Sequence, residues 1–138
     1  MLKTELIHPE LLKSIAAAGH GAQILITDGN YPSSTKTDSS VEKVYLNLAP
    51  GLINATQVLE VLTETINVEA ATVMEPNEGE DPLIFNEFKK ILPENTEFNK
   101  LERFDFYDNC VDNNDLCAVI VTGEQRIYAN LLLTIGVV

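Results

Sequence analysis

Residues 19–32 read Gly-His-Gly-Ala-Gln-Ile-Leu-Ile-Thr-Asp-Gly-Asn-Tyr-Pro, and this stretch decides how the chain folds. Its segment Ala22 to Thr27 is almost continuously apolar, which is typical of a strand covered on both faces. Before it, Pro9 to Ala18 has the pattern of a helix that stops at Gly19. After it, Asp28 to Ser40 is rich in turn-forming residues and predicts a long loop. We therefore expect a central strand in a layered fold.

Strands and helices alternate along the rest of the chain. The patterns predict strands at 43–48, 70–74, 116–122 and about 128–135, a short strand at 97–103, and helices at 54–66, 82–91 and 104–113. Such alternation favours an α/β fold, with a three-layer arrangement in which helices flank a largely parallel or mixed central sheet. No linker divides the chain, so we expect one domain over residues 1–138.

Periodicity also assigns sides to three of these elements. It turns Val44, Leu46 and Leu48 inward, places Phe104, Tyr107 and Val111 on one helix face, and projects Tyr128 and Asn130 to the same side of the last strand. We expect the last two side chains to form either one wall of a polar pocket or a solvated strand entrance.

Composition excludes several kinds of partner. The 138 residues carry a formal net charge of -12 with 9 Lys and Arg in total, which argues against binding a nucleic-acid backbone. No apolar stretch approaches the roughly 20 residues needed to cross a bilayer. The acidic residue in Met1 to Glu5 is unlike a signal peptide, so we expect a cytoplasmic protein. Cys110 and Cys117 lack the partners of a metal knuckle, and we expect unpaired thiols and no metal site.

His20 and Asp28 stand at opposite ends of the predicted central strand, in a chain with 2 His. An imidazole both gives and takes a proton near neutral pH, so the two side chains are a candidate acid/base pair beside a small-molecule pocket. The alternative for His20 is a contact with the carbonyls at the end of the preceding helix. For Asp28 it is a local turn with Gly29.

A guanidinium adjoins three aromatic residues in the segment Arg103 to Tyr107. Arginine offers a rigid set of donors for hydroxyl groups, and aromatic faces suit the apolar face of a sugar. The alternative is a surface arginine above a core stripe of aromatic side chains.

These motifs together resemble one known family, the L-fucose mutarotases and D-ribose pyranases. The resemblance rests on Gly19-His20-Gly21, Asp28 with Pro32, Arg103-Phe104 with Phe106-Tyr107, Thr122-Gly123-Glu124, and Tyr128-Ala129-Asn130. It implies an isomerase that interconverts sugar forms without a cofactor, in ring-shaped homo-oligomers that are often decameric, with sites near subunit interfaces. It also implies a role for each matched residue: His20 as general acid/base, Asp28, Arg103, Tyr128 and Asn130 as substrate contacts, and Tyr107 as a further participant.

Arg103 within the aromatic motif resembles the fucose branch more than the ribose branch. We therefore expect an L-fucose mutarotase that interconverts α and β anomers, with a monosaccharide as its partner. Three alternatives stay open: a D-ribose pyranase that interconverts pyranose and furanose forms, a non-catalytic protein that binds sugar or assists its transport, and a purely structural oligomer.

Overall fold

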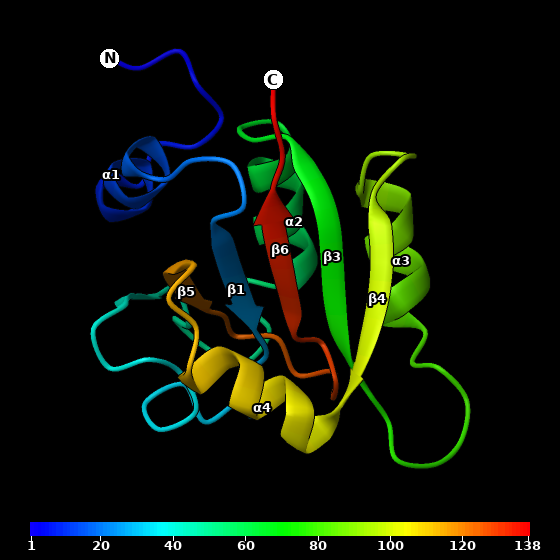
Figure 1. The fold of residues 1–138 in the computed structure, drawn as a ribbon. Helices are drawn as coiled ribbons and strands as arrows, with labels where there is room; N and C mark the ends of the chain where they lie inside the picture. Colours follow the sequence, from blue (N-terminus) through cyan, green and yellow to red (C-terminus); the bar gives the residue numbers. More distant parts are fainter.

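The apolar stretch of the opening motif forms β1 (Gln23–Thr27), the strand predicted to be central. The computed structural model describes residues 1–138, and all of β1 from Ile24 onward is buried. One helix, α1 (Pro9–Ala17), precedes β1. The elements after β1 are, in chain order, β2 (Glu42–Tyr45), α2 (Ala55–Thr63), β3 (Val68–Glu75), α3 (Ile84–Ile91), β4 (Glu97–Glu102), α4 (Arg103–Val111), β5 (Leu116–Val121) and β6 (Leu131–Ile135). Figure 1 shows their arrangement.

One mixed sheet contains all six strands, in the order β2-β5-β1-β6-β3-β4. β6 is antiparallel to both of its neighbours, β1 and β3, whereas the pairs β1 with β5, β2 with β5 and β3 with β4 are parallel. In Figure 1 the arrow of β6 accordingly points opposite to that of β1. Five strands therefore place their carboxyl ends at the same edge of the sheet.

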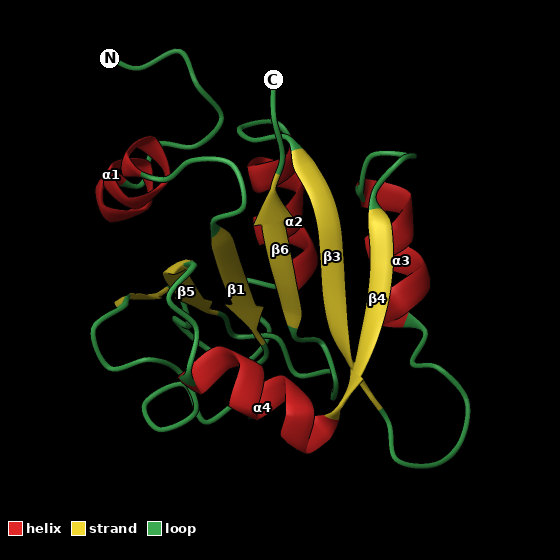
Figure 2. Ribbon diagram, in the orientation of Figure 1, coloured by secondary structure: helices red, strands yellow, loops and turns green.

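Helices cover both faces of this sheet, as the red and yellow elements of Figure 2 show. Alternate residues of β1 belong to two separate hydrophobic cores, one on each face of the sheet. Ile24 and Ile26 lie in the core that includes residues of α1, α2 and α3, and Leu25 lies in the core that includes residues of α4. Because each face of the central strands is buried under helices, the apolar run of β1 is nearly unbroken. The predicted three-layer α/β arrangement is confirmed.

Three predicted details are wrong. The second strand ends at Tyr45, so Val44 is buried as expected but Leu48 is 86% exposed, because the chain turns away after Leu46. In α4 the buried residues are Phe106, Tyr107 and Cys110, while Phe104 is exposed. The last strand begins at Leu131, so Tyr128 and Asn130 belong to the preceding loop.

The carboxyl edge of the sheet has the geometry of a ligand site. The connections that follow β1 and β3 lead to opposite sides of β6, to β2 and β4 respectively. In open α/β sheets, ligands bind where the strand order diverges in this way, beyond the carboxyl ends of the strands. None of the helices is long and apolar enough to span a membrane.

Candidate functional site

A cavity of about 220 Å³ lies at the carboxyl edge, beyond the ends of β1, β3 and β4. Its lining combines polar and aromatic side chains from four segments of the chain: Asp28, Asn30, Tyr31, Met74, Arg103, Tyr107, Ile127, Tyr128 and Asn130. Five of the six predicted site residues are among them. This volume is below the roughly 300–1,000 Å³ of pockets that hold drug-sized ligands, so the cavity suits a smaller molecule.

Asp28 is the buried polar centre of the cavity, with 3% of its surface exposed. Its Oδ1 accepts a hydrogen bond from the backbone N–H of Asn30 at 2.9 Å, which is the local turn that the sequence left open. Its Oδ2 accepts from Asn130 Nδ2 at 3.1 Å. Burial raises the pKa of the Asp28 carboxyl above its usual range, although these hydrogen bonds oppose the effect.

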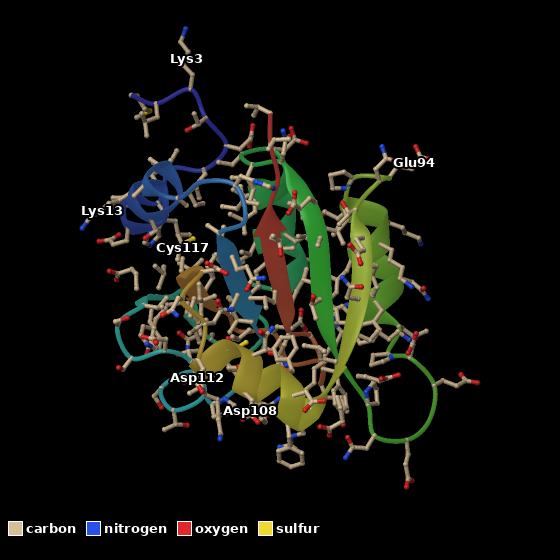
Figure 3. All side chains as sticks on the ribbon, viewed as in Figure 1. Lys3, Lys13, Glu94, Asp108, Asp112 and Cys117 are labelled. Atoms are coloured by element: carbon tan, nitrogen blue, oxygen red, sulfur yellow. The ribbon has the colours of Figure 1, made fainter.

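One side of the cavity is an aromatic wall formed by Tyr107 of α4 and Tyr31 of the loop after β1. The Tyr31 and Tyr107 rings meet edge to face with centroids 5.3 Å apart, and the Tyr31 hydroxyl donates to the Lys36 carbonyl at 2.8 Å. The Arg103 guanidinium lies over the Tyr107 ring, 5.6 Å from its centroid. Arg103 therefore lies over this wall and also lines the cavity. Asp108 of α4 and Asp112, the residue after the helix, are exposed (Figure 3).

The loop that carries Tyr128 and Asn130 is anchored by the motif Thr122-Gly123-Glu124. The Thr122 hydroxyl donates to the Thr27 carbonyl at 2.7 Å, which joins the ends of β5 and β1. Glu124 accepts from both Nε and an outer nitrogen of Arg126 at 2.9 Å, and Arg126 also donates to Glu87 of α3. Tyr128 itself has φ of 62°, a backbone conformation that residues other than glycine rarely adopt.

His20 is not part of this cavity. It precedes β1 at the opposite edge of the sheet, with its side chain 58% exposed and its Nε2 2.9 Å from Glu69 Oε2. Within one chain, His20 and Asp28 therefore do not meet at the same pocket. The length of β1, about 16 Å for five residues at ~3.3 Å each, separates the two ends.

Sequence reasoning did not select Asn30, Tyr31, Met74 and Ile127 as lining residues. Asn30 and Tyr31 belong to the loop directly after β1, and their position beyond a strand's carboxyl end was a usable signal. Met74 resembles any other apolar residue of β3, and Ile127 has no periodic pattern that marks it. Only the fold brings these two residues to the cavity.

The side chains of the cavity favour recognition of a neutral polar molecule. Asp28, Asn130 and the tyrosine hydroxyl groups supply donors and acceptors, while the aromatic rings and Met74 supply apolar surface. The structure contains no group of three or more His, Cys, Asp or Glu side chains arranged to hold a metal ion, and both cysteines are free.

The fold and the cavity define an α/β protein with a small-molecule site at the carboxyl edge of its sheet, and comparison with known proteins agrees. The model of the RbsD / FucU transport protein family matches residues 1–138. The chain is 34% identical to human fucose mutarotase, over 96% of this chain and 90% of that protein. It is 29% identical to D-ribose pyranase of Staphylococcus haemolyticus, over 100% and 99% of the two chains.

A solved structure extends this similarity to three dimensions. Bacillus subtilis RbsD, in complex with D-ribose, superimposes with a TM-score of 0.86 at 28% identity, covering 100% of this chain and 99% of that one. The chain belongs to the RbsD / FucU family. Its relatives carry the names of sugar mutarotases and pyranases, and the chain is an enzyme of the same isomerase class.

Proposed function

We propose that this enzyme interconverts the α and β anomers of L-fucose without a cofactor. The observation that carries the proposal is the convergence of Asp28, Arg103 and Asn130 on one small cavity, although they lie on segments far apart in the sequence. Tyr107 and Tyr128 complete the polar and aromatic surface around them. Such a cavity offers hydrogen bonds to several hydroxyl groups of a pyranose ring and an aromatic face to its C–H groups.

The chemistry needs only proton transfer. A base takes the proton of the anomeric hydroxyl while an acid protonates the ring oxygen, and the C1–O5 bond breaks to give the open aldehyde. Rotation about C1–C2 and reclosure with the reverse proton transfers then give the other anomer. An imidazole serves in both directions, and such general acid/base catalysis contributes typically 10²–10⁴-fold.

The apolar side chains support fucose as the sugar. Met74 lies near the end of β3 and is buried, and Ile127 also lines the cavity, with 65% of its surface exposed. L-Fucose carries a methyl group on C5, where D-ribose has no carbon substituent in its pyranose form. We assign Met74 and Ile127 to that methyl group, with Arg103 binding the ring hydroxyl groups.

His20 is the proposed acid/base group, and its position requires a second protomer. Because His20 and the cavity lie at opposite edges of the sheet, His20 cannot reach a sugar bound by Asp28 of its own chain. We propose that His20 completes the cavity of a neighbouring protomer in a homo-oligomer. The resemblance implies that a decamer is the expected assembly, and a cytoplasmic location stays a prediction.

Saturation-transfer NMR of anomer exchange tests the reaction with L-fucose, D-ribose and D-galactose. We expect the enzyme to accelerate exchange of L-fucose most strongly, and His20→Asn to abolish the acceleration without unfolding the protein. Unchanged exchange rates for every sugar would contradict the proposal, even if a sugar binds saturably.

Mixed assemblies test the shared site. His20→Asn and Asp28→Asn are each expected to be inactive, but a mixed oligomer joins the intact cavity of the first to the intact His20 of the second. Random pairing in equal amounts restores activity to about a quarter of the sites. If His20 acted within its own chain, mixing would restore nothing.

D-Ribose pyranase activity is the second candidate, favoured by the similarity to pyranases and to the ribose-bound RbsD structure. The same NMR experiment separates the two, because pyranose and furanose forms of ribose have distinct anomeric signals. Preferential acceleration of their exchange would decide for the pyranase.

A further inference from the structure

His20 and Glu69 form a side-chain pair across the end of a strand. His20 Nε2 and Glu69 Oε2 are 2.9 Å apart, although the residues are 49 positions apart in the sequence. His20 precedes β1 and Glu69 is the second residue of β3, and β6 lies between these two strands. The pair therefore closes over the carboxyl end of β6, at the edge of the sheet opposite the cavity.

The backbone segments that carry His20 and Glu69 are both held to Ile135 of β6. Val68 pairs with Ile135 and Ala70 with Thr134, so Glu69 is the additional residue of a bulge in the ladder. Bulges re-aim side chains and are frequent next to functional sites. On the other side, the Gly21 N–H donates to the Ile135 carbonyl at 2.9 Å, with Gly21 at φ of 84°.

Gly136, the residue after β6, leaves room for the carboxylate. A Cβ at this position would lie 3.2 Å from Glu69 Cβ, closer than most contacts between such atoms, and 3.4 Å from its backbone nitrogen. A side chain here would require Glu69 to shift by a few tenths of an ångström. The bulge at Glu69, the turn at Gly21 and the absence of a side chain at Gly136 thus each help to position the His20–Glu69 pair.

We propose that Glu69 is a positioning residue for His20. This inference rests on the proposed function, in which His20 transfers protons at the sugar of a neighbouring protomer. A carboxylate accepts hydrogen bonds and donates none, so the neutral imidazole beside it carries its proton on Nε2. The Nδ1 lone pair is then the basic atom of the ring, and the hydrogen bond fixes the direction in which Nδ1 points.

Nitrogen-15 NMR of the complete enzyme reads the pair directly, without an activity measurement. Long-range proton–nitrogen correlations identify which ring nitrogen carries the proton in the neutral form. We expect His20 to be protonated on Nε2 alone in the wild type and to become a mixture of both tautomers in Glu69→Ala. A wild-type His20 protonated on Nδ1, or present as a mixture, would overturn the proposal.

Kinetics test whether the pair matters for proton transfer. Glu69→Ala is expected to lower kcat about tenfold with little change in KM, since the substrate contacts remain and a misdirected base loses part of its contribution. Gly136→Ala keeps both side chains but crowds Glu69, so it should lower kcat in the same direction. A Glu69→Ala enzyme with the kcat of the wild type would overturn the proposal.

The other histidine provides the matched control. His8 Nδ1 lies 3.3 Å from Glu10 Oε2 without forming a hydrogen bond. Glu10→Gln should leave kcat unchanged. If the kcat of Glu69→Ala equals that of Glu10→Gln, Glu69 has no positioning role. If the wild type accelerates no exchange at all, the proposed function fails, while the tautomer measurement still reports on the pair.

Discussion

Asn130 binds Asp28 through both ends of its amide. Asn130 Oδ1 accepts from the Asp28 backbone N–H at 2.8 Å, and Asn130 Nδ2 donates to Asp28 Oδ2 at 3.1 Å. This reciprocal contact joins residues 102 positions apart and fixes the orientation of the amide, since a rotated amide would lose both bonds. The carboxylate that we assign to the sugar is therefore held in place before any sugar arrives.

Asn130→Asp tests this arrangement. The variant loses the donor to Asp28 and places two carboxylates side by side, which raises the pKa of Asp28 further by repulsion of like charges. We expect sugar affinity at pH 7 to fall by about 2 kcal/mol, roughly 30-fold. Titration calorimetry with L-fucose should show partial recovery as the pH is lowered, because the two carboxyl groups then share one proton. Affinity equal to wild type at pH 7 would contradict the assigned role.

Asn113→Asp is its control. Asn113 is a buried amide whose Nδ2 donates to Gln23 Oε1 at 2.6 Å, at the edge of the sheet remote from the cavity. The loss of this hydrogen bond should lower thermal stability without weakening sugar binding.

Glu124→Gln is expected to reduce stability in a pH-dependent way. Burial alone raises the pKa of Glu124, but the hydrogen bonds and charge of Arg126 outweigh it, so the pKa is lowered from the usual 4.5. A lowered pKa stabilises the fold fully above the unfolded value, and this stability is lost as the pH falls through the folded value. We expect the variant to lose about 1–3 kcal/mol at pH 7.

Chemical denaturation at several pH values measures this difference. The gap between wild type and Glu124→Gln should narrow as the pH falls below about 4.5, because the unfolded chain is protonated there while the folded carboxylate takes up its proton only at a lower pH. A gap that is constant down to pH 3 would show that Glu124 contributes by packing instead of by its charge.

Gly123→Ala tests the close approach of two loops. A Cβ at residue 123 would clash with the backbone carbonyl of Leu52 and lie 2.5 Å from that of Ala49. Neither backbone atom can rotate away, so we expect a loss of about 1–3 kcal/mol in the free energy of unfolding. Gly19→Ala is the matched substitution, since no atom lies within 4 Å of its new Cβ. Equal stability of the two variants would contradict the close approach.

Ile127→Ser tests the assignment of the sugar's methyl group. Ile127 is largely exposed, so its replacement should leave the fold intact. The kcat/KM for L-fucose should fall by about 1 kcal/mol, roughly fivefold. D-Arabinose, which has the same ring configuration without the methyl group, should be affected much less. Equal losses for the two sugars in NMR exchange rates would remove Ile127 from methyl recognition.

The sequence predicted the central layers of the fold better than its edges. β1 and β5 are continuous apolar runs, and burial on both faces of the sheet gives such strands a strong signal. The start of β6 was misplaced because Tyr128 and Asn130 fit an alternating pattern, whereas Tyr128 adopts a left-handed backbone conformation that no pattern of polarity reveals. Leu48 was misplaced because β2 ends three residues before the apolar pattern does.

The candidate site was predictable where its residues lie at strand ends or in a recognisable motif. Asp28 follows β1 directly, and Arg103 follows β4. His20 and Asp28 were expected at opposite ends of one strand, but the motif does not show that only the Asp28 end of that strand carries the cavity. Glu69 carries no sequence signal of its own, since its role depends on a bulge and on a residue 49 positions away.

β1 keeps the His20 imidazole and the cavity of each protomer at opposite edges of the sheet. In the proposed arrangement, activity therefore depends on whether the assembly of protomers is closed. In the proposed arrangement, an antiparallel two-fold pair completes two sites, and a head-to-tail ring completes as many sites as it has protomers. An open chain always leaves one cavity without an imidazole and one imidazole idle. Specific activity should therefore rise in steps as assemblies close, and dilution that opens them should lower it before the protomers unfold.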